Sequence, residues 1–255
     1  MPKELLDFME RDSSETEYII EQLLRPDSGY GIIAGRTGLG KTNMVLNLSF
    51  WLALGKAFFN LNMRRSKVCY FAFEGGEDNL RDRYLKLIIR EPDYPELGWL
   101  QVERLDSLVL LEKNNRERFK KMIQPFDVVL LDPIKWMVGL DYTKPGRAAE
   151  FTKALTEILH QEGKVAIISM QIRKRDPRVK IEPGDLFELK GAADYVEDAA
   201  FALLLERSEL RGKHVATQLK DRYLTLYFAK HREATKDLDP IELYYDYDNC
   251  EFQTV

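Results

Sequence analysis

The sequence predicts an α/β domain with a mostly parallel sheet that is covered by helices on both faces. Three observations support this fold class. Short apolar runs alternate with helical patterns between residues 30 and 170, which is typical of a parallel sheet. A glycine-rich motif joins the first apolar run to the first helical pattern. After residue 199 the chain changes to strand patterns with short connections, which favours an antiparallel extension.

The strands are expected where short apolar runs end in polar or turn residues. These segments are residues 30–34, 67–73, 100–105, 127–132, 165–170, 199–206, 224–230 and 241–247. The run from residue 128 to residue 131 is wholly apolar, which indicates a strand buried on both faces.

Helices are expected where apolar residues recur at helical spacing. These segments are residues 15–24, 43–54, 78–88, 114–123 and 147–161. No internal repeat or linker rich in Gly, Ser or Pro divides the chain. We therefore expect residues 1–255 to form one domain, with residues 1–25 as an N-terminal arm and residues 199–255 as an antiparallel extension.

Composition limits the classes of function. The chain has 255 residues, is 45% hydrophobic and 31% charged, and carries a net charge of −4. No apolar run approaches the roughly 20 residues that span a bilayer, and the acidic N-terminus does not resemble a signal peptide. The cysteines, Cys69 and Cys250, form no metal pattern, so a reduced, cytoplasmic setting is expected. In an acidic protein, any nucleic-acid site must be a local basic patch.

The glycine-rich motif fits the phosphate-loop pattern of a Gly, four free positions and then Gly-Lys-Thr. Its residues are Gly35, Arg36, Thr37, Gly38, Leu39, Gly40, Lys41 and Thr42. The glycines let successive backbone N–H groups face a phosphate, and the following helix adds its N-terminal dipole. Lys41 is expected to reach the β- and γ-phosphates, and the Thr42 hydroxyl is expected to bind Mg²⁺.

Asp132 ends the apolar run that starts at residue 128. A carboxylate at the carboxyl end of a buried strand can hold Mg²⁺ beside a phosphate loop. An acid at a strand end is a weak signal alone, and the phosphate loop earlier in the chain strengthens it.

Glu74 ends another expected strand and precedes two glycines. A carboxylate there can orient and polarise the water that attacks the γ-phosphate. Glu77 and Asp78 are the alternatives, but they are more typical of first-turn acids that favour the helix dipole. Geometry therefore favours Glu74.

Gln171 follows the expected strand at residues 165–170. Its amide could bond the γ-phosphate and report its loss to the next loop, or it could be an ordinary polar residue at a strand end.

The next loop contains a cluster of cations. They are Arg173, Lys174, Arg175, Arg178 and Lys180. Such a cluster suggests contact with a nucleic-acid backbone, although charge runs are more often solvated surface. Its place after the Gln171 strand favours the functional interpretation.

Lys230 and Arg232 have alternate spacing at the end of another expected strand. Alternate residues of a strand point the same way, so the two cations could reach one phosphate together, in the same subunit or in another.

The order of these motifs resembles the RecA-like ATPase core, and within it the RepA-like and DnaB-like hexameric replicative helicases. The segment from Phe73 to Arg83 is similar to the RepA-like segment with the catalytic glutamate, and Leu131-Asp132-Pro133 fits the second motif of that group. Lys230-His231-Arg232 resembles the DnaB-type Lys-x-Arg pair. This resemblance implies a RecA-like twisted sheet, ATP as the nucleotide, and a pair that reaches the γ-phosphate of a neighbouring subunit.

The sequence therefore suggests an ATP-hydrolysing motor, a hexameric DNA helicase that uses ATP and Mg²⁺ on single-stranded DNA in replication. Two alternatives remain open. One is a recombination or repair filament ATPase, and the other is a KaiC-like nucleotide-gated switch or loader. The basic loop separates the DNA-dependent functions from a pure switch, which has no need of DNA-stimulated turnover.

Overall fold

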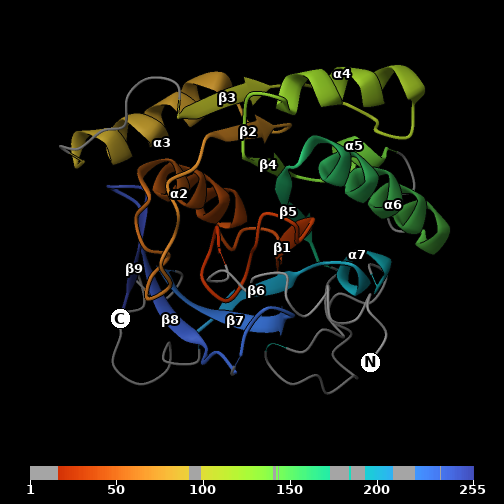
Figure 1. Cartoon of the computed structure of the whole chain (residues 1–255). Coiled ribbons are helices and arrows are strands. Elements are labelled where there is room, and N and C mark those ends of the chain that lie inside the picture. Colours follow the sequence, from red (N-terminus) through yellow and green to blue (C-terminus); the bar gives the residue numbers. More distant parts are fainter. Residues whose placement is uncertain are drawn as a thin grey trace.

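The computed structural model describes residues 17–91, 99–139, 142, 144–172, 184, 193–208, 222–235 and 237–255. Within these ranges the protein is built around one twisted sheet (Figure 1). The basic cluster at residues 173–180 lies outside the described residues.

The sheet has the strand order β3-β2-β4-β5-β1-β6-β7-β8-β9. Its strands are β1 (Tyr30–Gly35), β2 (Val68–Ala72), β3 (Leu100–Arg104), β4 (Val128–Asp132), β5 (Val165–Gln171), β6 (Phe201–Arg207), β7 (Tyr223–His231), β8 (Ile241–Asp246) and β9 (Glu251–Thr254). Strands β3 to β6 in this order pair in parallel, and β7, β8 and β9 continue the sheet in antiparallel pairing. The predicted fold class is confirmed.

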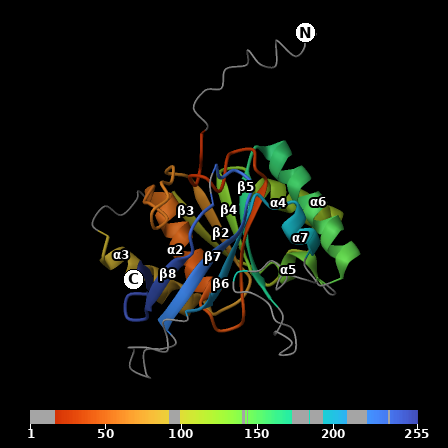
Figure 2. The same cartoon turned by 90° about the horizontal axis from the view of Figure 1, so that it is seen from below.

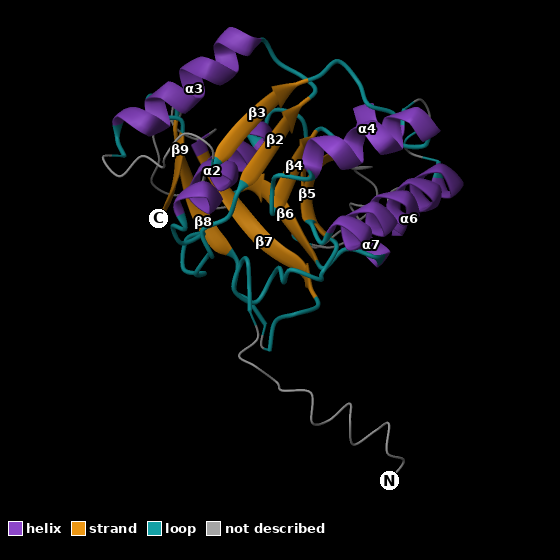
Figure 3. Cartoon of the chain, turned by 45° about the horizontal axis from the view of Figure 1, so that its top comes forward, coloured by secondary structure: helices purple, strands orange, loops and turns teal. Residues whose placement is uncertain are grey.

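Helices cover both faces of the parallel part (Figures 2 and 3). They are α2 (Lys41–Leu54), α3 (Glu77–Ile89), α4 (Lys113–Ile123), α5 (Lys135–Val138), α6 (Pro145–Glu162) and α7 (Ala193–Glu197). Two separate apolar cores reflect the two layers: α2 and α3 contribute to one core, and α4, α5, α6 and α7 contribute to the other.

The alternation of side chains along each strand supplies both cores. In β2, Val68 and Tyr70 belong to the core under α2, whereas Cys69 and Phe71 belong to the core on the opposite face. Successive side chains of a strand point to opposite faces, so a strand covered on both sides is apolar throughout. This is why the central strands appear in the sequence as continuous apolar runs.

The expected helix at residues 15–24 is wrong in its described part. Residues 17–24 form a turn in which Ile20 and Leu24 exchange backbone hydrogen bonds of 3.1 and 2.9 Å. Four apolar side chains, those of Ile19, Ile20, Leu23 and Leu24, are all buried. Tertiary burial of these side chains therefore decides the local backbone, and helix propensity does not.

The C-terminal extension also differs in detail from the expectation. Strand β6 pairs with β1 in parallel, with Ile32 beside Ala202, so the antiparallel arrangement starts with β7. Strand β9 and the short helices α5 and α7 were not expected from local patterns. They are too short to give a clear periodic signal.

A buried asparagine ties α2 to the last hairpin. Asn47 is fully buried; its Nδ2 donates to the Cys250 carbonyl at 2.8 Å, and its Oδ1 accepts from the Phe252 backbone N–H at 3.1 Å. The helix that follows the phosphate loop is thereby fixed to the β8–β9 hairpin. No helix in the described part of the chain is long and apolar enough to cross a membrane.

Candidate functional site

The phosphate loop connects β1 to α2 at the carboxyl edge of the sheet. Gly38 and Gly40 have φ angles of 80° and 81°, a left-handed region that other residues enter at a steric cost. A Cβ added to Gly35 would lie 2.9 Å from the Leu205 carbonyl oxygen on the neighbouring strand. Tight packing and left-handed backbone therefore both require glycine in this loop.

The Lys41 side chain folds over the loop and donates to the Arg36 carbonyl at 2.8 Å. Burial lowers the pKa of the Lys41 ammonium, while the negative charges of Asp132 and Glu74 act in the opposite direction. The Lys41 ammonium thus lies at the loop and close enough to Asp132 and Glu74 to be influenced by their charges.

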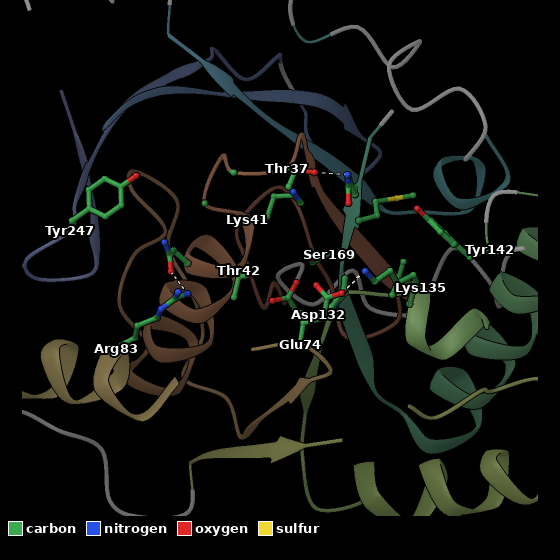
Figure 4. Close-up of a pocket in the computed structure, with 17 residues that line it drawn as sticks. Thr37, Lys41, Thr42, Glu74, Arg83, Asp132, Lys135, Tyr142, Ser169 and Tyr247 are labelled. Carbon is green, nitrogen blue, oxygen red and sulfur yellow. Dashed lines mark hydrogen bonds and ion pairs between the residues drawn. The ribbon is translucent and has the colours of Figure 1, made fainter. Parts of the chain in front are cut away.

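A pocket of about 340 Å³ lies beside the loop (Figure 4). Its lining combines residues from the phosphate loop, α2, α3, β4, α5, β5, the β8–β9 turn and the segments that connect them. They are Thr37, Gly38, Gly40, Lys41, Thr42, Asn43, Glu74, Arg83, Asp132, Pro133, Ile134, Lys135, Tyr142, Ser169, Met170, Gln171 and Tyr247. The structure therefore brings together Lys41, Thr42, Glu74, Asp132 and Gln171, which sequence reasoning had selected separately.

Asp132 and Thr42 provide oxygen atoms of the kind that Mg²⁺ prefers. Asp132 is only 4% exposed, and its Oδ2 accepts from the Tyr70 hydroxyl at 2.9 Å. Burial and then the Asp132 charge raise the pKa of Tyr70, so this hydroxyl remains a donor. The buried Ser169 hydroxyl also lines the pocket and has no hydrogen-bond partner among the described residues.

This donor set fits a hydrated divalent cation. The described residues contain no group of three or more His, Cys, Asp and Glu side chains that could enclose a metal ion. A cation at this position would need phosphate oxygens and water to complete its shell, which is the usual arrangement for Mg²⁺ with a nucleotide.

Glu74 follows β2 and lies half-exposed at the pocket. Its Oε1 pairs with the Lys135 ammonium and accepts from the Trp136 indole N–H at 3.1 Å. Partial burial alone would raise the pKa of Glu74, but the hydrogen bonds from Lys135 and Trp136 outweigh it and lower the pKa. Glu77 and Asp78 instead occupy the first turn of α3 and do not line this pocket.

Gln171, the last residue of β5, bridges to the phosphate loop. Its Nε2 donates to the Thr37 hydroxyl, and its side chain lines the pocket. The amide therefore connects the end of β5 to the phosphate loop.

Lys230 and Arg232 lie far from this pocket. The Lys230 ammonium donates to the Glu197 carbonyl at 2.8 Å, and Arg232 donates to the same carbonyl at the end of α7. Lys230 pairs with Ala202, and the Ala200 backbone N–H donates to the Tyr30 carbonyl, so both cations are near the amino-terminal end of β1. Strand β1 spans roughly 16 Å between that end and the phosphate loop, at about 3.3 Å per residue.

Sequence reasoning missed several lining residues. Lys135 lines the pocket, and Trp136 donates to Glu74, which lines it too. Both follow Asp132 closely, so their place after a strand end is a signal that could have found them. Arg83 donates to the Asn43 Oδ1 at 2.6 Å and comes from the helix after Glu74. No local signal indicates Tyr247, which reaches the pocket from the β8–β9 turn.

Comparisons with known proteins agree with this arrangement. A family model described as an AAA domain matches residues 2–177. No curated protein matches the chain in sequence.

Three solved structures are similar to the chain. The "ATPase Domain of G40P" is 13% identical with a TM-score of 0.68, covering 99% of this chain and 96% of that one. A DnaB-like replicative helicase, studied with primase, is 12% identical with a TM-score of 0.69, covering 98% of this chain and 66% of that one. The KaiC-like protein PH0186 from Pyrococcus horikoshii OT3 is 13% identical with a TM-score of 0.60, covering 89% of each chain. At these identities the likeness concerns the fold.

Proposed function

The chain belongs to the AAA-domain family and has the RecA-like P-loop ATPase fold shared by DnaB-like helicases, and from this premise we propose that it is an ATP-hydrolysing motor of the hexameric helicase type. In this proposal it acts on single-stranded DNA in replication. The observation that carries the proposal is the shared pocket, in which Lys41, Thr42, Glu74 and Asp132 line one cavity.

The nucleotide is ATP with Mg²⁺. The backbone of residues 35–42 and the Lys41 ammonium bind the phosphates, while Thr42 and Asp132 hold the metal ion. When bound, Mg²⁺ neutralises negative charge on the β- and γ-phosphate oxygens. Tyr70 fixes the orientation of the Asp132 carboxylate through its hydrogen bond.

Hydrolysis requires an oriented water molecule. Glu74 accepts a proton from that water as the general base, and its position at the pocket wall supports this role. Gln171 contacts the γ-phosphate and links its presence to the segment that follows β5. The bond between Gln171 and Thr37 supports this link.

The cations Lys230 and Arg232 serve a neighbouring subunit. Strand β1 separates them from the phosphate loop of their own chain, and both side chains bond to the Glu197 carbonyl at the end of α7. This separation supports a homo-oligomer, a hexameric ring in our proposal, in which each chain completes the ATP site of the next. A cation supplied in trans stabilises charge on the transferring phosphoryl group.

Single-stranded DNA binds to the basic cluster, which consists of Arg173, Lys174, Arg175, Arg178 and Lys180. The cluster begins two residues after Gln171 in the sequence, which supports coupling between the nucleotide and DNA. We treat residues 1–255 as a single domain with an N-terminal arm at residues 1–25 and the extension at residues 199–255.

The test is the ATPase rate with and without single-stranded DNA, together with a sizing run in the presence of AMP-PNP. A motor of this type should form a ring with the analogue and hydrolyse ATP faster when DNA is present. A monomeric enzyme with a DNA-independent rate would contradict the proposal.

A KaiC-like switch is the second candidate, because a KaiC-like protein shares the fold. A recombination filament ATPase is the other alternative. Slow turnover that ignores DNA but changes the assembly state would favour the switch. Open filaments of variable length on DNA, in place of closed rings, would favour the recombination protein.

A further inference from the structure

Lys135 is a cation of the pocket that the roles above do not use. It begins α5, three residues after Asp132, and its side chain is 34% exposed. The start of this helix is fixed by the Ile134 backbone N–H, which donates to the Ser169 carbonyl at 2.9 Å. In Figure 4 the carboxylates of Glu74 and Asp132 lie between Lys41 and Thr42 on one side and Lys135 on the other.

Two donors of α5 act on one oxygen of Glu74. The Lys135 ammonium and the Trp136 indole N–H both bind Oε1, and the ammonium lies 5.3 Å from the centre of the indole ring. A carboxylate that is paired with an ammonium holds its negative charge more firmly and is a weaker base. The pairing therefore opposes the role of Glu74 as a general base.

ATP changes the balance of charge in this pocket. Its terminal phosphate carries more negative charge than a carboxylate and offers more acceptor oxygens, whereas ADP lacks that group. Three cations line the described pocket, namely Lys41, Arg83 and Lys135. Among them, Lys135 forms an ion pair with Glu74.

We propose that Lys135 is a γ-phosphate-responsive residue, which pairs with Glu74 when the terminal phosphate is absent and transfers to that phosphate when ATP binds. The transfer releases Glu74 to contact the attacking water. Glu74 is thereby restrained in the empty and ADP-bound enzyme and freed in the ATP-bound enzyme. The proposal rests on the ATP site of the proposed function and is independent of its DNA partner.

Nucleotide affinities without DNA provide the first test. The ratio of ADP to AMP-PNP dissociation constants is measured for the wild type, Lys135→Met, Glu74→Gln and the double variant. Lys135→Met should lower the preference for AMP-PNP about threefold to tenfold, because a charge-assisted bond to the phosphate is lost. Glu74→Gln should raise the preference, because Lys135 no longer has to leave a carboxylate.

The double variant gives the decisive comparison. Once Lys135 is absent, the Glu74 substitution has no ion pair left to break, so the double variant should resemble Lys135→Met. Lys135→Arg should retain most of the preference, and Lys153→Met, an exposed change on α6, serves as the matched control. Additive effects of the two single changes would overturn the proposal. So would a loss of preference in Arg83→Met that is absent from Lys135→Met.

Trp136 provides a second readout that needs no hydrolysis. Transfer of Lys135 removes a charge from beside the indole, so AMP-PNP should change the intrinsic fluorescence and ADP should not. The change should disappear in Trp136→Phe and in Lys135→Met, while Lys153→Met retains it. An equal response to ADP and AMP-PNP would contradict the transfer. These measurements remain informative even when DNA fails to stimulate hydrolysis, so the two proposals fail separately.

Discussion

Asp132 illustrates how several roles meet in a single residue of this site. It ends a buried strand, is 4% exposed and accepts a hydrogen bond from the buried Tyr70 hydroxyl. A buried carboxylate is costly unless it has partners. The tyrosine supplies one partner, and the remaining lone pairs face the pocket where a cation would bind.

Lys41 and Glu74 should separate binding from turnover. Lys41→Ala removes the charge partner of the γ-phosphate and should reduce hydrolysis about 100-fold or more. Glu74→Gln should retain nucleotide binding and lose about 100-fold or more in turnover, because only the attacking water is affected. Affinity by equilibrium titration and the rate of phosphate release distinguish the two. Full turnover in Glu74→Gln would indicate that Glu77 or Asp78 is the general base instead.

Lys230 makes stability depend on pH. Burial, and then repulsion from Arg232, lower the pKa of Lys230 to about 8 from its ordinary 10.5. Between these pH values the unfolded chain binds more protons than the folded chain, so this residue makes folding more favourable as pH rises. Below about pH 8 its unfavourable contribution is fully present.

The measurement is the melting temperature from pH 7 to pH 10. The curve of Lys230→Met should lack the part of the pH dependence that the wild type gains between pH 8 and 10, and Lys153→Met should follow the wild type. Parallel curves for wild type and Lys230→Met would show that the folded-state pKa is not lowered.

At the scale of elements, the site depends on how α2 is held. Its residues from Met44 to Ala53 are all buried, between the sheet and the C-terminal hairpin. The N-terminus of α2 carries the phosphate loop, and Tyr247 of the β8–β9 turn lines the same pocket. The hairpin therefore stabilises the nucleotide site from outside the parallel sheet.

Asn47→Leu should weaken this connection. The change leaves the Cys250 carbonyl and the Phe252 N–H without partners, at about 1–3 kcal/mol for each buried group. The free energy of unfolding from urea titration should fall accordingly, and Asn60→Ala, an exposed change, should have little effect. An unchanged midpoint for Asn47→Leu would mean that the hairpin is held by its apolar contacts alone.

The basic cluster is tested as a segment. Replacement of Arg173, Lys174 and Arg175 by Ala should leave the melting temperature unchanged and weaken single-stranded DNA binding at all sequences. Contacts to the backbone carry no base information, and the slope of affinity against salt should flatten by up to about 0.7 per contact removed. Unchanged affinity across a salt titration would indicate that the cluster is ordinary solvated surface and does not contact DNA.

For the whole molecule, the ends of β1 divide the proposed ATP site between subunits. The phosphate loop follows the carboxyl end of β1. Lys230 and Arg232 bond to the Glu197 carbonyl, near the amino end of β1. In the proposed assembly, one chain would present part of an ATP site at each end of β1. Assembly would join the two parts and make catalysis depend on oligomerisation.

Mixed assemblies test this arrangement. Arg232→Ala should bind ATP normally and hydrolyse about 10³-fold more slowly, because the neighbour's phosphoryl group loses a stabilising cation. Mixing it with Lys41→Ala should restore some activity, since an intact phosphate loop on one chain can meet an intact Arg232 on the other. Rings of Arg232→Ala with full activity would exclude the role in trans. Inactive mixtures, shown to be co-assembled, would indicate a role in cis or a need for several intact sites.

The sequence by itself determined the features that depend on local pattern. The phosphate loop was predictable because its glycine spacing is a property of consecutive residues, and Asp132 because it ends an apolar run. The alternation of strands and helices followed from side-chain periodicity, which each segment carries independently of its neighbours. Because parallel strands have their carboxyl ends on the same side of a sheet, the ends of β4 and β5 were then expected beside the phosphate loop.

Only the tertiary structure decided the contacts between distant segments. The turn at residues 17–24 is set by burial against the core, and the parallel pairing of β6 is set by its place beside β1. Lys135 meets Glu74, and Tyr247 reaches the pocket, because the chain order of the strands differs from their order in the sheet. Such contacts arise from packing among elements, and no single segment has a periodicity that encodes them.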